Sequence, residues 1–527
     1  MNELLATAGV LVLALAAAAA IVLPPGRPRV AAMLIAAFLA PVLICGDQWH
    51  SAQLSDIRDD PTRLAASIAI GFAAVAALMA AFRRWPILLP LAIVAALPFR
   101  VPLEAGGDTA NLLVPLYLVI GAAVLTTALR DCGANRAGPP VGGSEWGDQP
   151  EEQLHRRAGG PNSLTGPAGP AVWLPRLLAT VVMLYALQTL YSPDFSKSLQ
   201  NVCFFFAPFS LVYALLRDVE WDRRLLTAAL AVVAVEAVAF VLVGSVEYLT
   251  RSLFWNDQVI RSNEFHTYFR VNSIFWDPNI YGRYLALTIV LAMSALLWAR
   301  EHRSLALLTG LVAVLWVGLV PTFSQSSFAA LLVGLAALAA LRWSWRWTLA
   351  ALGAGAALVV VIVLFAGGVS KINPSRLNID TGGRANLVSG GSKLFAQRPL
   401  WGYGAGSFPR AYREHAATRK APVAVSHTEP VTVAAEQGLI GLAAYGALLV
   451  VALWTMASGL WSRSEGIRFT ARAAVFATFV ALLVHTMAYA GFYEDPITWA
   501  LLALAVSLAR PPSTPEGAGQ DKPRAAN

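Results

Sequence analysis

The sequence predicts an all-α protein, a polytopic membrane bundle of about 13–15 transmembrane helices with a large external loop that contains amphipathic helices. Composition is the first reason, because 57% of the 527 residues are hydrophobic and only 13% are charged. A soluble domain carries about 25% charged residues, so this chain has too few to cover water-soluble globules. Length is the second reason, because about 300 apolar residues at about 20 per helix suffice for roughly fifteen spans. A protein with a single membrane anchor is excluded.

The spans are expected at apolar runs, several of which are short or separated only by a tight turn. The runs fall at 4–23, 30–45, 65–82, 86–99, 111–129, 174–190, 203–216, 225–248, 281–299, 304–320, 328–341, 348–366, 431–457, 473–490 and 497–509. The first run lacks the basic leader and the cleavage site of a signal peptide, so we expect it to be a retained span.

Basic residues orient these spans. Arginines recur in every second gap between the apolar runs, as at Arg83, Arg217, Arg300 and Arg342. Positively charged loops stay in the cytoplasm, so these gaps are predicted to be cytoplasmic and the intervening gaps external. On this basis the N-terminus is expected outside and the tail after Arg510 inside. Since this orientation accounts for much of the net charge of +8, nucleic acid is not an expected partner.

The chain divides into four predicted parts. Two of them are rich in Gly, Pro and charged residues without periodicity, which is typical of disordered segments. The parts are N-terminal transmembrane helices at 1–129, a disordered cytoplasmic insert at 130–173, a transmembrane core at 174–510 with external loops at 250–280 and 367–428, and a disordered cytoplasmic tail at 511–527.

The longest external loop ends at His427, shortly before Pro430. Proline suits the first turn of a helix, so His427 is expected just outside a helix N-terminus, where the helix dipole favours the neutral imidazole that can accept a proton. A surface histidine is the alternative. Glu436 argues against that alternative, because it lies about 9 Å into the same membrane helix, where an ionisable side chain is usually functional or paired. Gly438 and Gly441 are expected to allow close helix packing.

Basic residues also occur in the external loops, where the positive-inside rule does not place them. Arg384 begins a predicted amphipathic helix on the outer leaflet, and Arg398 and Arg410 follow it. Between these two arginines, Gly402 and Gly404 permit a tight turn or an anion-binding nest of backbone amides. Such residues suit an anionic substrate.

Arg270 stands in the earlier external loop among aromatic residues that resemble interfacial anchors. An arginine can hold a phosphate through two parallel hydrogen bonds and never loses its charge. Arg270 and Arg384 together could therefore hold a diphosphate. The alternative for each is a side chain that reaches out to lipid headgroups.

An acidic external loop containing Asp59 and Asp60 is a rival site, because carboxylates can hold a metal ion. Pro61 follows directly, so a solvated turn is the preferred interpretation. The three cysteines have no metal-ligand spacing, and the sequence contains no metal, nucleotide or nucleophile motif. No metal ion and no cofactor are therefore expected.

Taken together, these motifs resemble the O-antigen ligase and O-antigen polymerase superfamily, which are bacterial membrane glycosyltransferases of the GT-C type. The family signature is a histidine, a glutamate nine residues on and Gly-x-x-Gly just after it, and His427, Glu436, Gly438 and Gly441 have that spacing. Further matches are the arginine-plus-Gly-x-Gly loop, the Phe-x-Asp-Pro-Asn segment after Arg270 and two spans joined by residues 322–326. The resemblance covers about 250–500.

The resemblance implies transfer of a glycan from an undecaprenyl-diphosphate donor to a hydroxyl of a glycan, glycolipid or other acceptor. The reaction would take place at the outer face of the bacterial plasma membrane, with the membrane lipids as further partners. Arg270 and Arg384 would neutralise the leaving diphosphate, and His427 would accept the acceptor's proton, giving inversion without a metal. Ligase is preferred and polymerase is second. The residues expected to contact the substrates are Glu436, Asn279, Arg398, Arg410, Gly402 and Gly404.

A transporter of a small anion or a glycolipid is the alternative from another class. It would place ionisable residues at the bilayer midplane and broken helices in both halves of the chain. Apart from Glu436 and His485 the apolar runs are nearly free of charge, so the enzyme is preferred.

Overall fold

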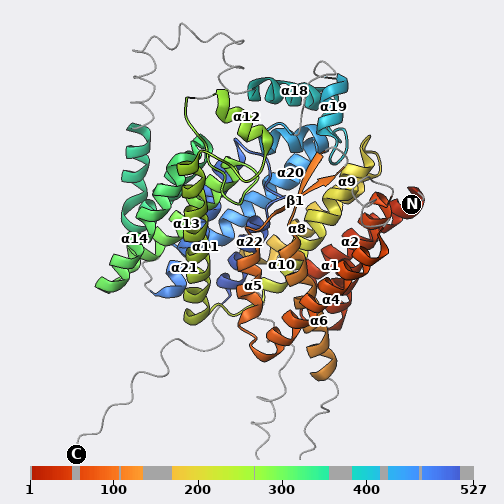
Figure 1. Cartoon of the computed structure of the whole chain (residues 1–527), viewed down its shortest axis with the longest axis horizontal. Helices are drawn as coiled ribbons and strands as arrows, with labels where there is room; N and C mark the ends of the chain where they lie inside the picture. The colour runs from red at the N-terminus through yellow and green to blue at the C-terminus, as the bar shows by residue number, and fades with distance from the viewer. Residues whose placement is uncertain are drawn as a thin grey trace, which may run out of the picture.

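The computed structural model is a bundle of membrane-length helices, as the composition predicts (Figure 1). It describes residues 3–49, 60–105, 108–134, 169–265, 267–354, 383–415, 425–461 and 466–510. The predicted tail and most of the predicted insert lie outside the described residues. The described edges of that insert, at 130–134 and 169–173, are helical rather than irregular.

The elements follow the order of the apolar runs. The first half of the chain forms α1 (Glu3–Val22), α2 (Arg27–Gln48), α4 (Pro61–Arg84), α5 (Leu88–Ala96), β1 (Val101–Ala105), β2 (Asp108–Leu112), α6 (Val114–Ala134), η1 (Gly169–Val172), α8 (Trp173–Thr189), α9 (Phe195–Asn201), η2 (Val202–Phe206) and α10 (Ala207–Leu216). The second half forms α11 (Arg223–Thr250), α12 (Asp257–Phe265), α13 (Pro278–Trp298), α14 (His302–Leu319), η3 (Val320–Thr322), α15 (Gln325–Ala339), η4 (Ala340–Ser344), α18 (Arg384–Gln397), α19 (Phe408–His415), α20 (Glu429–Ala457), α21 (Ile467–Thr486) and α22 (Pro496–Ala509).

Twelve helices among the described residues are long and apolar enough to cross a membrane, and α22 is a shorter apolar helix. The predicted class, a polytopic helical membrane bundle, is confirmed. The apolar run 86–99 differs, since it forms only the nine-residue helix α5. That helix is about 14 Å long and cannot cross a hydrocarbon core of about 30 Å. Pro86 and Pro98 flank it, and proline disfavours helix continuation.

Short polar side chains set the starts of many helices. Each accepts a hydrogen bond from a backbone amide of the first turn, which would otherwise have no partner. These residues are Asp60, Asp194, Asp222, Asp277, Ser324 and Asp495. In three of these six helices, α4, α13 and α22, a proline also occupies the first turn, so these helix starts could be read from the sequence.

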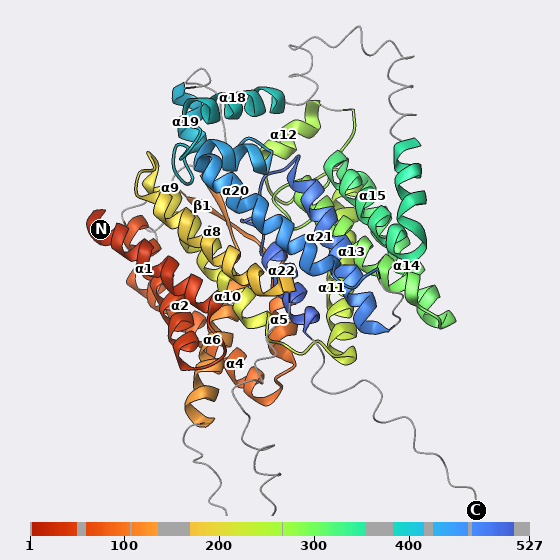
Figure 2. The ribbon, with the colours of Figure 1, turned by 180° about the vertical axis from the view of Figure 1, so that it is seen from behind.

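Helix packing joins the two halves of the chain. Helix α1 packs against α2, α8 and α10, and α13 packs against α14, α15 and α21. Helix α20 contacts α8, α18, α21 and α22, so it connects both groups. Helices α12, α18 and α19 lie together at one end of the bundle, which we call the site end (Figures 1 and 2).

The structure also contains an antiparallel hairpin that the all-helical prediction did not include. Strands β1 and β2 pair from Val101 opposite Leu112 to Ala105 opposite Asp108. The sequence between them is Gly106-Gly107, and Gly-Gly between two short extended runs is a known hairpin signal.

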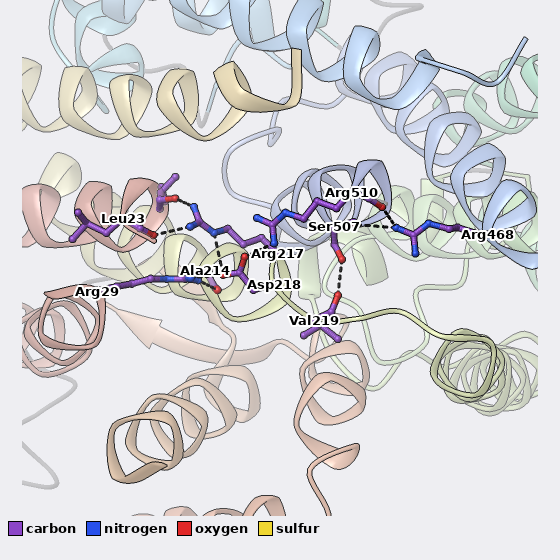
Figure 3. Close-up of polar contacts among 10 residues, drawn as sticks. Leu23, Arg29, Ala214, Arg217, Asp218, Val219, Arg468, Ser507 and Arg510 are labelled. Atoms are coloured by element: carbon purple, nitrogen blue, oxygen red, sulfur yellow. Dashed lines mark hydrogen bonds and ion pairs between the residues drawn. The ribbon is translucent and has the colours of Figure 1, made fainter. Parts of the chain in front are cut away.

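At the opposite end of the bundle, Asp218 joins helix ends from distant parts of the chain (Figure 3). Its carboxylate pairs with Arg29, with Arg217 at 3.3 Å and with Arg510 at 2.6 Å. Burial alone would raise the pKa of Asp218, but the guanidinium groups of Arg29 and Arg217 lower it to about 2. Arg217 also donates to the carbonyl of Leu23 at 2.6 Å. These arginines therefore hold α1, α2, α10 and α22 together, besides contributing to the charge asymmetry of the loops.

Candidate functional site

At the site end of the bundle, two of the predicted catalytic residues, His427 and Arg270, each lie within electrostatic range of the third, Arg384. Burial lowers the pKa of both His427 and Arg270, and the positive charge of Arg384 is close enough to lower both further. The carboxylate of Asp277 acts on the same two groups in the opposite direction. One histidine, two arginines and one aspartate thus share one electrostatic neighbourhood, although they come from three separate loops and helix starts.

His427 lies just outside the N-terminus of α20, as predicted. Its backbone is left-handed, with φ of 62°, a conformation that few residues other than glycine adopt. The Ser426 hydroxyl fixes this turn, since it donates to the Thr428 carbonyl at 2.8 Å and accepts from the Thr428 amide at 3.2 Å. Thr428 in turn donates to the Met487 carbonyl at 3.1 Å, so its hydroxyl does not cap the helix. The half-buried imidazole lies 6.2 Å from the Tyr489 ring and is held mainly neutral, as a general base must be.

Arg270 is oriented by backbone and side-chain acceptors. Its backbone amide and carbonyl both bond to the Asn263 side chain at 3.0 Å. Its Nε donates to the Thr322 carbonyl at 2.9 Å, and its Nη2 donates to Asn279 Oδ1 at 3.3 Å. In the part of the chain that the structure describes, neither Arg270 nor Arg384 forms a salt bridge. Both positive charges therefore remain available for an anion.

Asn279 belongs to a buried polar network behind Arg270. Its side-chain oxygen accepts from both Arg270 and the Ser324 hydroxyl, the latter at 2.9 Å. Ser324 lies 3.2 Å from the Ser326 hydroxyl, which lies 3.2 Å from Nε2 of His485. The network joins the starts of α13 and α15 to α21. In this geometry Asn279 positions Arg270, and its predicted contact with substrate stays a prediction.

Glu436 holds the glycine-rich loop that precedes α19. Its two carboxylate oxygens accept from the amides of Gly406 and Phe408, each at 2.9 Å. The Gly404 amide donates to the Glu436 carbonyl at 2.8 Å, and the Gly402 amide donates within its own turn at 3.0 Å. The amides of Gly402 and Gly404 are thus taken by protein acceptors. Of the two alternatives, a tight turn and an anion-binding nest, these bonds favour the turn, and the contact of the two glycines with substrate stays a prediction.

Gly438 interrupts α20 beside this loop. It has φ of 64° and ψ of −162°, a region that essentially only glycine occupies. A Cβ atom here would lie 2.4 Å from the Leu400 carbonyl oxygen, so Gly438 allows close contact with this loop rather than the close packing between helices that was predicted. The break frees backbone groups of α20, and the loop satisfies them: Leu439 donates to the Pro399 carbonyl at 2.7 Å, and the Ala435 carbonyl accepts from the loop at 3.0 Å.

Two further glutamates act in the same way as Glu436. Glu247, near the end of α11, accepts from the amides of Asn272 and Ser273 at 3.1 and 2.7 Å. Glu429, at the start of α20, accepts from the amides of residues 491 and 492 at 2.7 and 3.1 Å. We call Glu247, Glu429 and Glu436 the carboxylate clamps. Each holds one of the loops that carry or surround Arg270, Tyr489 and the glycines, because a buried carboxylate bonds strongly to amides.

Other buried ionisable groups lie deeper in the bundle. Arg283 and Asp495 form a salt bridge of 2.7 Å between side chains that are 4% and 3% exposed. The Arg283 guanidinium lies 6.0 Å from the centroid of the Tyr489 ring, which in turn lies 6.2 Å from the His427 ring. Tyr284 donates to Glu236 in the middle of α11 at 3.2 Å. Arg283 and Glu236 were not predicted from the sequence, although a lone charge within an apolar run is the signal that marks such residues.

The remaining predicted residues lie on the surface of the site end. The Arg398 guanidinium stacks 4.5 Å from the Tyr403 ring centroid and is exposed. Arg410 is also exposed, pairs with Glu414 at 3.0 Å and donates to the Pro193 carbonyl. The structure does not bring either side chain to His427 through any hydrogen bond of the described residues, so their contact with substrate stays a prediction.

The rival acidic site looks like a helix start. Asp60 accepts from the amides of Thr62 and Arg63 at 3.1 and 3.2 Å and pairs with the Arg63 side chain. Asp59 lies outside the described residues. Among those that are described, no three His, Cys, Asp or Glu side chains gather as metal ligands would.

Comparison with known families now bears on this geometry. Residues 310–446 match the family model described as O-antigen ligase. This segment is therefore similar to O-antigen ligase domains. The resemblance to the O-antigen ligase and polymerase superfamily is confirmed, and the family match supports a membrane glycosyltransferase of the O-antigen ligase type. The matched segment contains Arg384, His427 and the carboxylate clamps Glu429 and Glu436, whereas Arg270 and Asn279 precede it. No curated protein matches the chain.

Proposed function

We propose that this O-antigen ligase-type protein transfers a glycan from a polyprenyl diphosphate, such as undecaprenyl diphosphate, to a hydroxyl acceptor, with inversion and without a metal ion. The observation that carries the proposal is a half-buried histidine of lowered pKa and an arginine, Arg270, that both lie within electrostatic range of Arg384, while neither arginine has a salt bridge among the described residues. A base beside an anion-binding pair is the constellation that such a transfer needs. Ligation is preferred to polymerisation.

Arg270 and Arg384 would bind the diphosphate of the donor. Two like charges within electrostatic range destabilise each other, and Asp277 offsets only one of them, so an anion between them is favoured. Arg270 is already held by the Thr322 carbonyl and Asn279, which limits the entropy lost when it grips a phosphate. As the anomeric carbon–oxygen bond breaks, negative charge grows on the leaving diphosphate, and the two guanidinium groups stabilise it.

His427 would act as the general base. Its neutral imidazole accepts the proton of the acceptor hydroxyl while that oxygen attacks the anomeric carbon from the face opposite the diphosphate. One carbon–oxygen bond forms and one breaks, the electron pair leaves with the diphosphate and the proton remains on the imidazole. This single displacement inverts the anomeric configuration. Burial first, and then the positive charge of Arg384, lower the pKa of His427 and so favour the deprotonated imidazole before the step.

The test is transfer by the purified protein from a polyprenyl-diphosphate glycan in the presence of EDTA. We expect His427→Ala to remain folded and to lose about 10²–10⁴-fold in rate, while the lipid-linked glycan accumulates in cells. His415→Ala is the matched control, because His415 is exposed at the end of α19. Transfer by His427→Ala at close to the wild-type rate would refute the role of His427, and loss of wild-type transfer in EDTA would refute metal independence.

Ligase and polymerase differ in the acceptor, so a strain that lacks the protein distinguishes them. Loss of a ligase leaves long glycan chains on the carrier lipid, whereas loss of a polymerase leaves single repeat units. We expect long chains. Single repeat units would assign the protein as a polymerase and leave the chemistry at His427 unchanged.

A transporter is the second candidate, and the interruption of α20 at Gly438 and the half-buried Glu236 within α11 favour it. Against it, the backbone groups freed at Gly438 are bonded to the loop before α19. Catalysis of transfer can be measured without a sealed membrane, whereas transport requires a membrane that separates two compartments. Transfer by the protein in detergent micelles would therefore exclude transport as the sole activity, whereas glycan or anion movement into sealed vesicles without transfer would support it.

A further inference from the structure

One large cavity of the molecule opens toward the end of α13 that is opposite to Asn279. It is a cavity of about 1050 Å³ among α5, α11, α13, α21 and α22. Along α13 its lining runs from Tyr284 to Trp298, which corresponds to a depth of about 21 Å. Its outer residues follow the end of α13, whereas Asn279 and the site lie at the start of that helix, about 30 Å away. The cavity is thus separate from the proposed catalytic site.

The walls of this cavity are mostly apolar. Representative wall residues are Leu230, Val233, Leu287, Leu291, Leu501 and Leu504. The depth of about 21 Å exceeds one leaflet, which is half of a hydrocarbon core of about 30 Å. The shape therefore accommodates alkyl chains that run parallel to the helices, and water in such a hollow would have few polar partners.

The mouth of the cavity is basic. Arg223 at the start of α11, Arg300 after α13 and Arg342 in η4 all line it, and Glu301 is the acidic residue among the lining groups. Three positive charges and one negative charge leave an excess of two. Basic residues at the end of an apolar pocket attract an anionic headgroup while the tails are buried.

We propose that this cavity binds one anionic phospholipid, with its acyl chains between α11 and α13 and its phosphate near Arg223, Arg300 and Arg342. An anionic phospholipid uses both the apolar depth of the cavity and its basic mouth. A zwitterionic phospholipid would use mainly the apolar depth, and free phosphate would use only the basic mouth. The lipid fills the space between α11 and the helices behind it. It is distinct from the glycan donor, whose diphosphate would react at the other end of α13.

The experiment compares phosphatidylglycerol, phosphatidylcholine with the same acyl chains, and inorganic phosphate, each added to the delipidated full-length protein in detergent. We expect phosphatidylglycerol to raise the Tm with its concentration, because a ligand of the folded state stabilises it, and native mass spectrometry to show one retained lipid. Phosphatidylcholine should be at least about tenfold weaker, and phosphate should have no effect. Equal stabilisation by the two lipids, or an effect of phosphate alone, would overturn the proposal.

Paired variants test the mouth. Arg223→Gln with Arg342→Gln should weaken phosphatidylglycerol binding at least about tenfold. Arg224→Gln with Arg346→Gln is the matched control, since these arginines lie close in sequence, remove the same charge and do not line the cavity. Equal weakening of phosphatidylglycerol binding in the two double variants would show that only the net charge of the protein matters, and would refute the site.

A filled cavity gives an independent test. Ala295 lines the cavity on α13 and is only partly buried, so Ala295→Trp occupies the space without removing any charge. We expect this variant to keep the far-UV circular dichroism and the elution volume of the wild type and to retain no phosphatidylglycerol in native mass spectra. Retention of one lipid by a folded Ala295→Trp protein would contradict the proposed position of the acyl chains.

Discussion

Glu436→Gln distinguishes a residue that holds a loop from a residue that contacts substrate. The family resemblance predicted substrate contact, whereas the geometry shows a carboxylate that is 6% exposed and accepts from the amides of Gly406 and Phe408. Glutamine has almost the same shape but only one acceptor oxygen. Its NH₂ group would face one of the two amides, so one hydrogen bond is replaced by two opposed donors.

The magnitude follows from these two contacts. A hydrogen bond to a charged group is worth about 1.5–3 kcal/mol, so Glu436→Gln should make opening of the loop easier by about that amount, or roughly ten- to hundredfold. Glu436→Ala loses both bonds and should cost about 3–6 kcal/mol. Glu414→Gln is the control, because its carboxylate is 47% exposed and its pair with Arg410 should contribute less than about 1 kcal/mol.

The assay is hydrogen exchange of the backbone amides of residues 402–412 in the purified full-length protein, measured by mass spectrometry. Exchange of these amides should accelerate about ten- to hundredfold in Glu436→Gln and stay unchanged in Glu414→Gln. Transfer kinetics on the same samples give a second readout, since a displaced loop should lower kcat. Unchanged exchange together with a raised KM would refute the clamp and restore direct substrate binding by Glu436.

Three further predictions concern the helix break, the charge cluster and the catalytic base. Gly438→Ala should lower the free energy of unfolding by about 3 kcal/mol or more, because its φ is positive and the space is filled, whereas Gly446→Ala in open space should be neutral or stabilising in the same thermal scans. The pKa of Asp218 in the folded protein is about 2, below its usual 3.8, so the free energy of unfolding of the wild type should fall by about 2 kcal/mol as the pH falls from about 4 to 2. Asp218→Asn should be less stable at neutral pH and should lack this pH dependence. Transfer rate should rise with pH about a midpoint below 6.5, and Arg384→Gln should move the midpoint of the remaining activity upward; an unmoved midpoint would contradict the electrostatic contact with His427.

Most of the fold was predictable because membrane helices are specified locally. An apolar run of about 20 residues can cross the membrane as a helix, because a helix satisfies its backbone groups within the segment, and Asp directly before Pro marks where α4, α13 and α22 begin. The errors have local causes as well. The run 86–99 had the right composition but not the right helix length between Pro86 and Pro98, and the hairpin signal at Gly106-Gly107 was not used.

The candidate site was predictable only in part. His427 before Pro430 and Arg384 at a helix start were identified from spacing, because their positions depend on neighbours in the chain. The partners of Arg270 were not, since the Thr322 carbonyl is 52 residues away along the chain. Glu247 was overlooked because its role depends on the amides of residues 272 and 273, which the sequence does not place beside α11.

Composition and local spacing were therefore enough to predict a polytopic helical membrane protein and to select one histidine and two arginines as the residues to test. Long-range contacts were needed to assign Glu436 to a loop and to make Gly402 and Gly404 part of the packing against α20. They also produced the Asp218 cluster and the cavity beside α13. The physical reason is that hydrophobic patterns and helix caps depend on neighbours in the chain. The role of a buried carboxylate or amide depends instead on its hydrogen-bond partner, which a distant segment of the chain supplies.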